Sequence, residues 1–295
     1  MTRRTRSKVS STVLTVLGVI AFAAQGQAGQ LQYSSGQEVV PDYAGWEANA
    51  DGSFNMVFGY MNRNYEEHLH LPIGANNKFE PGEMDRGQPT YFYPRRSRYV
   101  FRIKVPADFG SKELVWTLTS NGKTRRAYGS LKPDYALDDA AIYLNNSGYS
   151  QVGRAVRNKA PVVKIEGDLQ RTAKVGEALT LTSLVTDDGI PQIKPAPLFG
   201  GAGFKSALGL RVAWIVYRGA GDKVTFAPEQ FKVYGDFLHE GGNSPYTPGW
   251  VQPPLPADGR HTVKATFGEP GTYVVRVVAH DGGFETTQDL TVRVQ

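Results

Sequence analysis

The sequence predicts an all-β protein built from two β-sandwich domains, and three observations lead to this prediction. The chain combines 33 glycines and 18 prolines with 15 tyrosines and 14 phenylalanines, a balance of turn-forming and strand-forming residues. Short segments that alternate apolar and polar residues recur along the chain and are separated by turn signals. Only one segment, near 138–145, reads as a helix. We expect about seven strands and two long loop insertions in the second domain.

The first 28 residues have the features of a secretory signal peptide. Arg3, Arg4, Arg6 and Lys8 precede an uncharged apolar segment from Val9 to Ala24, and small residues follow at Gly26 and Ala28. We expect cleavage near Ala28 and a mature protein that is secreted or periplasmic. A membrane anchor is the alternative, but the apolar segment is shorter than the ~20 residues of a spanning helix. No transmembrane anchor is therefore expected.

Charge and cysteine content exclude several functional classes. The net charge is +5, but removal of the leader leaves 29 basic and 28 acidic residues. A nearly neutral mature chain does not indicate a nucleic-acid partner. The chain contains no cysteine, so disulfides, thiolate catalysis, cysteine zinc sites and iron–sulfur clusters are excluded.

The N-terminal domain, residues 29–157, is expected to be a β-sandwich with a short helix. Residues 46–60 carry an Asp51-Gly52 turn between strand-like segments, and residues 98–106 and 113–119 alternate as strands. Ser120-Asn121-Gly122-Lys123 is a hairpin signal. Asp138 is suited to cap the helix. We place the domain boundary at residue 158, before Ala160-Pro161, and match this half to no characterised family.

The C-terminal domain, residues 158–295, shows a clearer succession of strands. The expected strands are Val162–Ile165, Ala178–Val185, Arg211–Tyr217, Val224–Phe226, Thr262–Phe267, Thr272–His280 and Thr286–Val294. Trp214 lies in the third of them and Tyr273 in the sixth, where a seven-stranded sandwich buries large aromatic side chains. We expect both residues in the core.

This domain also resembles the polycystic-kidney-disease-like (PKD-like) and related immunoglobulin-like domains of bacterial secreted proteins. The segments that carry the resemblance are Asn158–Val163, Val175–Glu177, Val185–Gly189, Val212–Trp214, Phe267–Tyr273 and Ala279–Gly283. They are framework positions, so the resemblance implies the fold more than a function. The inserts 190–209 and 235–261 depart from the compact pattern of that family.

The two inserts are the best functional indication in the sequence. In an immunoglobulin-like sandwich the loops after the second, fourth and sixth strands lie at one end, and the inserts occupy the first two of these. They contain the aromatic residues Phe199, Phe204, Tyr246 and Trp250, which we select as candidate anchors for a ligand. The alternative is that the inserts cover an open sheet edge or contact the N-terminal domain.

The same end gathers ionisable residues that could hold a metal or move a proton. The candidates are Asp187, Asp188, His239, His261, His280 and Asp281. Calcium or zinc would suit these ligand types, and no other cofactor is expected. The grouping depends on topology alone, because no local spacing resembles a known metal motif. Asp-Asp-Gly and His-Asp-Gly-Gly are also ordinary turn sequences, in which the carboxylates bind nearby backbone amides.

No enzyme signature is present among the serine-hydrolase, phosphate-binding, dinucleotide-binding and zinc-protease motifs. Three functional classes remain. The first is a non-catalytic interaction module that binds an envelope protein or polysaccharide through the loops of the C-terminal domain. A structural spacer of the cell envelope is the second, and a metal-dependent module or enzyme is the third. The sequence does not indicate an oligomeric state.

Overall fold

The structure, a computed structural model, describes residues 33–147, 157–192, 209–230 and 255–295. Residues 33–295 form one compact unit. Strands dominate it, and within the described residues the only α-helix is α2 (Asp139–Ser147). The predicted all-β fold is confirmed.

The N-terminal half consists of short antiparallel sheets. Its strands are β1 (Val39–Ala48), β2 (Phe54–Asn62), β3 (Leu69–His70), β4 (Asn77–Glu80), β5 (Tyr91–Phe92), β6 (Arg95–Val105), β7 (Leu114–Ser120) and β8 (Lys123–Gly129). They pair in the orders β1-β2-β6, β4-β7-β8 and β3-β5. A 3₁₀ turn, η1 (Pro133–Tyr135), leads toward α2.

Local sequence signals explain both predicted hairpins of this half. Ala48 pairs with Phe54 across the Asp51-Gly52 turn, where Asp51 Oδ1 accepts a hydrogen bond from the Ser53 amide at 3.0 Å. The β7–β8 turn places Asn121 and Gly122 at φ of 45° and 72°. These left-handed values define the tight turn that favours Asn-Gly. The Asp138 cap is also confirmed, because its Oδ1 accepts the Ala141 amide at 2.7 Å.

Stacked aromatic rings form the core of this half. Trp116 is fully buried, stacks on Phe79 with ring centroids 5.7 Å apart, and meets the edge of Phe101 at 5.1 Å. Its indole N–H donates to Asn77 Oδ1 at 3.0 Å, while Asn77 Nδ2 donates to two backbone carbonyls. The polar groups of Trp116 and Asn77 are therefore paired, as burial requires.

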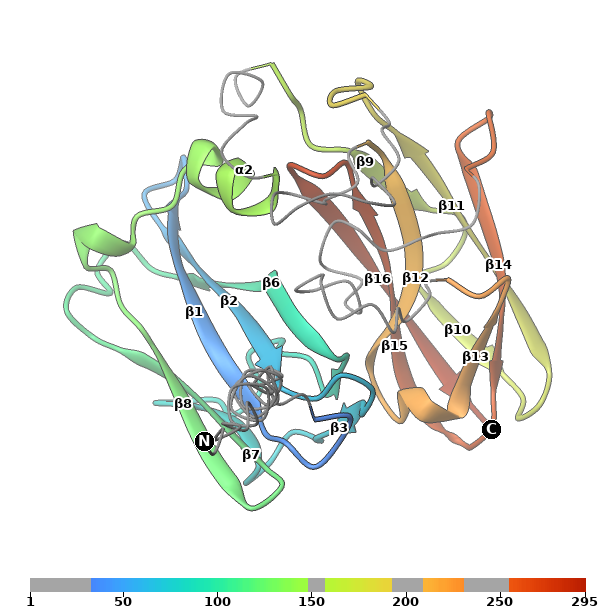
Figure 1. The fold of residues 1–295 in the computed structure, drawn as a ribbon, viewed down its shortest axis with the longest axis horizontal. Coiled ribbons are helices and arrows are strands. Elements are labelled where there is room, and N and C mark those ends of the chain that lie inside the picture. Colours follow the sequence, from blue (N-terminus) through green and yellow to red (C-terminus); the bar gives the residue numbers. More distant parts are fainter. Residues whose placement is uncertain (1–32, 148–156, 193–208, 231–254) are drawn as a thin grey trace, which may run out of the picture. The chain divides into compact units, whose positions relative to one another are not determined.

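The C-terminal half has the strand order of an immunoglobulin-like sandwich. Its strands are β9 (Val162–Ile165), β10 (Gln170–Ala173), β11 (Ala178–Thr186), β12 (Arg211–Arg218), β13 (Val224–Ala227), β14 (Arg260–Phe267), β15 (Gly271–His280) and β16 (Glu285–Val294). One sheet has the order β13-β14-β11-β9 and the other β10-β16-β15-β12. Figure 1 shows β11 and β14 in one layer and β15 and β16 in the other.

All seven strands predicted for this half are present. Among the described strands of this half only β10 was not predicted; it pairs in parallel with β16 from Gln170 opposite Thr291. Trp214 and Tyr273 lie in the core as predicted, with exposed fractions of 0% and 2%. The Tyr273 hydroxyl donates to the Glu269 carbonyl at 3.0 Å, which satisfies its polar end.

Hydrogen bonds join the two halves of the compact unit. The Val216 amide donates to the Tyr93 hydroxyl at 2.8 Å, and the Tyr217 hydroxyl donates to the Gly87 carbonyl at 2.5 Å. Arg218 adds a bidentate ion pair with Asp85 at 2.9 and 2.7 Å. One apolar cluster also includes core residues of both halves. The division into two domains at residue 158 stays a prediction.

Candidate functional site

Three connections leave the C-terminal sandwich at the same end, as the sequence analysis predicted. In the strand registers Leu184 lies opposite Arg260, and His280 lies opposite both Arg211 and Glu285. The antiparallel pairing of β13 with β14 brings the end of β13 toward the start of β14. We call this the loop end, defined as the end at which β11, β13 and β15 finish.

Asp281 fixes the short β15–β16 turn at the loop end. Its Oδ1 accepts the amides of Gly283 and Phe284 at 2.6 and 2.7 Å, and its backbone carbonyl accepts the Gly209 amide at 2.6 Å. The last bond ties the β15–β16 turn to the segment that enters β12. Asp281 therefore stabilises a turn, as expected for the His-Asp-Gly-Gly turn sequence.

The two neighbouring aspartates after β11 also bind backbone amides. Asp187 Oδ2 accepts the Gly189 amide at 3.0 Å. Asp188 accepts the Ile190 amide at 2.8 Å and the Lys159 amide at 3.0 Å through its two oxygens. Asp188 thus connects the start of the C-terminal half with the turn after β11.

Burial sets the protonation of the groups next to Asp281. It raises the pKa of Asp281 to about 6, against the lowering effect of the two backbone hydrogen bonds. Burial also lowers the pKa of His280 to about 3, helped by the nearby Arg211, so this imidazole is neutral at pH 7. Its Nδ1 accepts the Gly282 amide at 2.8 Å, which makes His280 a further part of the turn.

The predicted metal ligands do not all converge within the described residues. His261 points into the sandwich core, opposite Ser183 in register, with 3% of its surface exposed. Burial lowers its pKa to about 4. Asp187 acts electrostatically on Asp281, and the Asn158 side chain lies against the same carboxyl. Among described residues no three histidine, aspartate or glutamate side chains form a metal-binding group.

Five predicted site residues lie outside the described residues: Phe199, Phe204, His239, Tyr246 and Trp250. Their assignment to a ligand surface, and the calcium or zinc site that would include His239, stay predictions.

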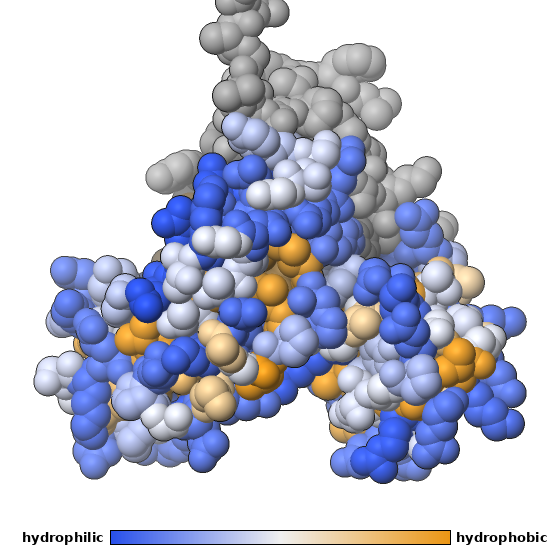
Figure 2. Space-filling model, turned by 90° about the horizontal axis from the view of Figure 1, so that it is seen from below, coloured by the Kyte–Doolittle hydropathy of each residue, from blue (hydrophilic) through white to orange (hydrophobic). Residues whose placement is uncertain are grey.

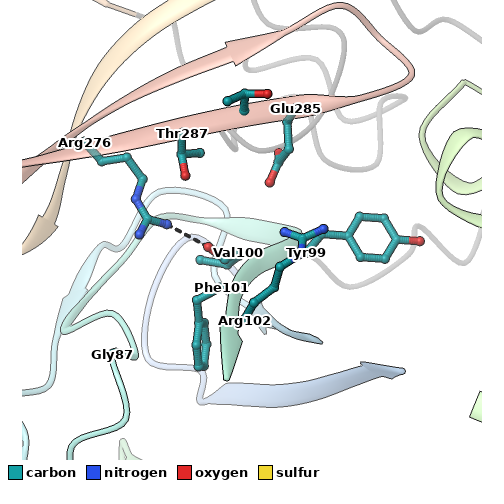
Figure 3. Close-up of a pocket in the computed structure, with 9 residues that line it drawn as sticks. Gly87, Tyr99, Val100, Phe101, Arg102, Arg276, Glu285 and Thr287 are labelled. Atoms are coloured by element: carbon teal, nitrogen blue, oxygen red, sulfur yellow. Dashed lines mark hydrogen bonds between the residues drawn. The ribbon is translucent and has the colours of Figure 1, made fainter. Parts of the chain in front are cut away.

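A cavity of about 360 Å³ lies where β6 faces β15 and β16, and the sequence analysis did not find it. Arg102, Arg276, Glu285 and Thr287 lie along its wall together with Tyr99. Figure 3 shows the Glu285 carboxyl and the Thr287 hydroxyl pointing from β16 toward β6, with Arg102 on the opposite side. In the sequence, the residue that could have indicated this cavity is Arg276, because it is a charged residue in the middle of the apolar strand β15.

The two arginines of this cavity are held by other side chains. Arg276 binds Asp289 through Nε and Nη2 at 2.6 and 2.9 Å, and its Nη1 donates to the Val100 carbonyl at 2.7 Å. Arg102 binds Glu47 through Nε and Nη2, both at 2.9 Å. Burial raises the pKa of Glu285 to about 8, although both guanidinium groups oppose this shift.

No helix of the described residues is long and apolar enough to cross a membrane. No family model matches the chain, and no curated protein matches it.

Solved structures give weak likenesses. Domains 4 and 5 of the S-layer protein SbsC share 10% identity over 62% of this chain and 65% of that one, with a TM-score of 0.23. The Clostridium thermocellum CbhA fibronectin(III)-like modules share 12% over 88% and 94%, and the D00-D0 domain of intimin shares 11% over 86% and 99%, each with a TM-score of 0.24. Similarity at this level assigns neither a family nor a function, and the immunoglobulin-like description depends on the strand order alone.

Proposed function

We propose that this chain is a non-catalytic interaction module that binds an envelope protein or polysaccharide through the loop end of its C-terminal sandwich. The observation that supports this proposal is the gathering of three connections, two of them long, at the end of a rigid framework. Long loops placed by a rigid sandwich are the usual position of binding residues.

The framework at the loop end is fixed from both halves of the chain. Asn146 of α2 donates to the Gly283 carbonyl at 2.9 Å, and the Tyr143 ring meets the Phe284 ring with centroids 5.5 Å apart. The turn therefore has partners on α2 in addition to its own hydrogen bonds. A framework that is already ordered loses less conformational entropy when a ligand binds.

The large apolar side chains exposed on the described residues do not mark a clear interface. Figure 2 shows a mostly hydrophilic face on which apolar colour is confined to small areas. Exposed large apolar side chains of the described residues, such as Met84 in the loop after β4, Tyr128 on β8 and Val162 on β9, come from separate segments. Single exposed apolar residues are normal and do not mark an interface. The aromatic inserts are the better source of anchors.

The test is the double substitution Tyr246→Ala and Trp250→Ala. If these residues anchor a ligand, the variant unfolds at the temperature of the unmodified chain but is no longer retained on isolated envelope polysaccharide or envelope proteins. Tyr128→Ala is the control, because Tyr128 is 53% exposed on the edge strand β8. Unchanged retention of a folded double variant would place the site elsewhere.

A structural spacer is the second candidate, and the hydrogen bonds and ion pair between the halves favour it. They would keep the halves in a fixed orientation whether or not a ligand binds. This function is supported if the double variant unfolds, because the aromatic residues then stabilise the fold. Replacement of residues 235–254 by a short Gly-Ser linker would then change the solution scattering of the protein without removing any retention.

A metal-dependent module is the third candidate. Asp187 Oδ1 and Asp281 Oδ2 are buried and accept no hydrogen bond from a described residue, so they could bind a cation. The buried Arg211 acts electrostatically on Asp281 and opposes a divalent ion there. Metal analysis of the purified chain, and thermal unfolding with added calcium or zinc, test this candidate. A rise in Tm that Asp281→Asn removes would support it.

We also propose that the protein is exported, cleaved near Ala28, and that its second half is PKD-like in kind. N-terminal sequencing of protein recovered from the periplasm or medium tests the export proposal. A mature chain that begins near Gly29 is expected, and one that begins at Met1 would contradict it.

A further inference from the structure

The cavity between β6 and the β15–β16 pair contains an acidic side chain without a partner. No described side chain or backbone amide lies within hydrogen-bonding distance of the Glu285 carboxyl, although Arg102 and Arg276 both act on it electrostatically. Glu38, by contrast, is fully buried and binds Arg63, Lys123 and Arg125. A partly buried carboxyl directed into a cavity is the kind of group that fixes the orientation of a ligand.

The hydrogen-bonding groups around Glu285 are held in place. Glu47 binds Nε and Nη2 of Arg102, so the position of the guanidinium is fixed and its Nη1 takes no part in this ion pair. Thr287 stands two residues after Glu285 on the same face of β16, and Figure 3 shows both side chains directed toward β6. The cavity therefore offers a donor from Arg102, a hydroxyl from Thr287 and a carboxyl from Glu285.

A local distortion of β6 adjoins these groups. Tyr99 has φ of 55°, a left-handed value that is uncommon for a bulky residue, and the β2–β6 register shifts between Phe58 and Tyr60. This bulge presents the Val100 carbonyl to Arg276. Bulges and strained residues often turn side chains and carbonyls toward a site.

The charges around the cavity favour an uncharged ligand. Each guanidinium already has its own carboxylate, Glu47 for Arg102 and Asp289 for Arg276. With Glu285 added, the group carries no net positive charge that would attract an anion. A carboxyl with a pKa of about 8 is mostly protonated at pH 7 and can both donate and accept a hydrogen bond. Donors and acceptors side by side suit a ligand with several hydroxyl groups.

We propose that this cavity binds one neutral sugar residue, with Glu285, Arg102 and Thr287 forming hydrogen bonds to its hydroxyl groups. The volume of about 360 Å³ lies at the lower end of the range for small-molecule sites, which fits a single ring. The residues named for this cavity differ from those proposed as anchors in the inserts, so either proposal can fail without the other.

The experiment measures binding of three pyranoses of different charge to the full chain at pH 7. D-Glucose is neutral, D-glucuronate is an anion, and D-glucosamine is largely a cation. Saturation-transfer difference NMR gives the signal and the Kd of each. We expect D-glucose or a neutral stereoisomer, D-galactose or D-mannose, to bind more tightly than either charged sugar.

Two variants locate the binding, and a matched variant controls for folding. Thr287→Val should weaken binding threefold to tenfold, as expected for one lost hydrogen bond, and Glu285→Ala should weaken it at least tenfold. Thr291→Val is the control, because Thr291 lies on the same face of β16, opposite Val274 and away from the cavity lining. It should leave the Kd unchanged.

Several outcomes would overturn the proposal. The first is no signal from any neutral hexose, and the second is tighter binding of glucuronate or glucosamine. Equal weakening by Thr287→Val and Thr291→Val would show that the threonine does not contact the sugar. Loss of binding in the Tyr246 and Trp250 double variant, with Glu285→Ala unaffected, would assign the sugar to the inserts instead. If Thr287→Val does not fold, the Kd of Glu285→Ala for the sugar shows whether the cavity is the binding site.

Discussion

Arg276 joins the two halves of the compact unit through a buried hydrogen bond. It is 7% exposed, lies in the middle of β15, and bonds to three groups at once. Nε and Nη2 bind Asp289, Nη1 donates to the Val100 carbonyl of the N-terminal half, and the guanidinium lies 3.5 Å from the centre of the Tyr217 ring. Arg276→Met keeps much of the volume and removes all three interactions.

The expected loss follows from these contacts. The charged hydrogen bond to Val100 contributes about 1.5–3 kcal/mol, and the contact with the Tyr217 ring about 0.5–2 kcal/mol. Asp289 is 40% exposed, so the ion pair adds only about 0–1 kcal/mol. We expect Arg276→Met to lower the free energy of unfolding by about 4 kcal/mol, which corresponds to about 10 °C in Tm for a chain of this size.

Thermal and urea unfolding of the full chain measure this loss. Arg293→Met is the matched control, because Arg293 is exposed on the neighbouring strand β16, and it should change the free energy by less than about 0.5 kcal/mol. Asp289→Asn should cost clearly less than Arg276→Met, since Arg276 retains its bond to Val100. Equal losses from the two arginine variants would refute the assignment of Arg276 to the contact between the halves.

Three further predictions concern the core, the cavity and the loop end. Trp214→Ala should lower the free energy of unfolding by about 3–5 kcal/mol in urea titration, because the side chain is fully buried; a loss below about 1 kcal/mol would contradict its core position. The pKa of Glu285 in the folded chain is about 8, above its usual value of 4.5. Between these pH values the folded chain holds a proton that the unfolded chain has released. The free energy of unfolding therefore falls as the pH rises from about 4.5 to 8. Glu285→Gln should therefore raise Tm by about 5 °C at pH 8.5, after allowance for partial exposure to solvent, and hardly at all at pH 4.5; an equal change at both values would show that titration is not the cause. Gly283→Ala should lower the free energy by about 2 kcal/mol, because the added methyl group would overlap the Tyr143 ring of α2, and differential scanning calorimetry showing an unchanged Tm would rule out that close contact.

Elements whose signals are local could be predicted from the residues alone. Asn121-Gly122 sets the turn between β7 and β8 because these residues adopt left-handed backbone conformations at low cost. Asp138 caps α2 through the amide three residues later. The strands of the C-terminal half, with Trp214 and Tyr273 in its core, follow from period-two alternation and turn spacing. The common end of the three connections then follows from strand order.

The roles of the charged residues depended on contacts that no local pattern contains. The sequence grouped Asp187, Asp188, His261, His280 and Asp281 as possible ligands. The structure shows the aspartates bound to turn amides and His261 inside the sandwich, because a side chain's direction is set by register and not by residue type.

No sequence pattern indicates which face of the second sandwich contacts the first half; this follows from the packing of distant segments. Arg276 and Glu285 are on adjacent strands of one sheet, and Arg102 is more than 170 positions earlier in the chain. They line one cavity because β6 lies against the outer face of β15 and β16, and its backbone is distorted at Tyr99. Burial on that face, rather than any motif, raises the pKa of Glu285.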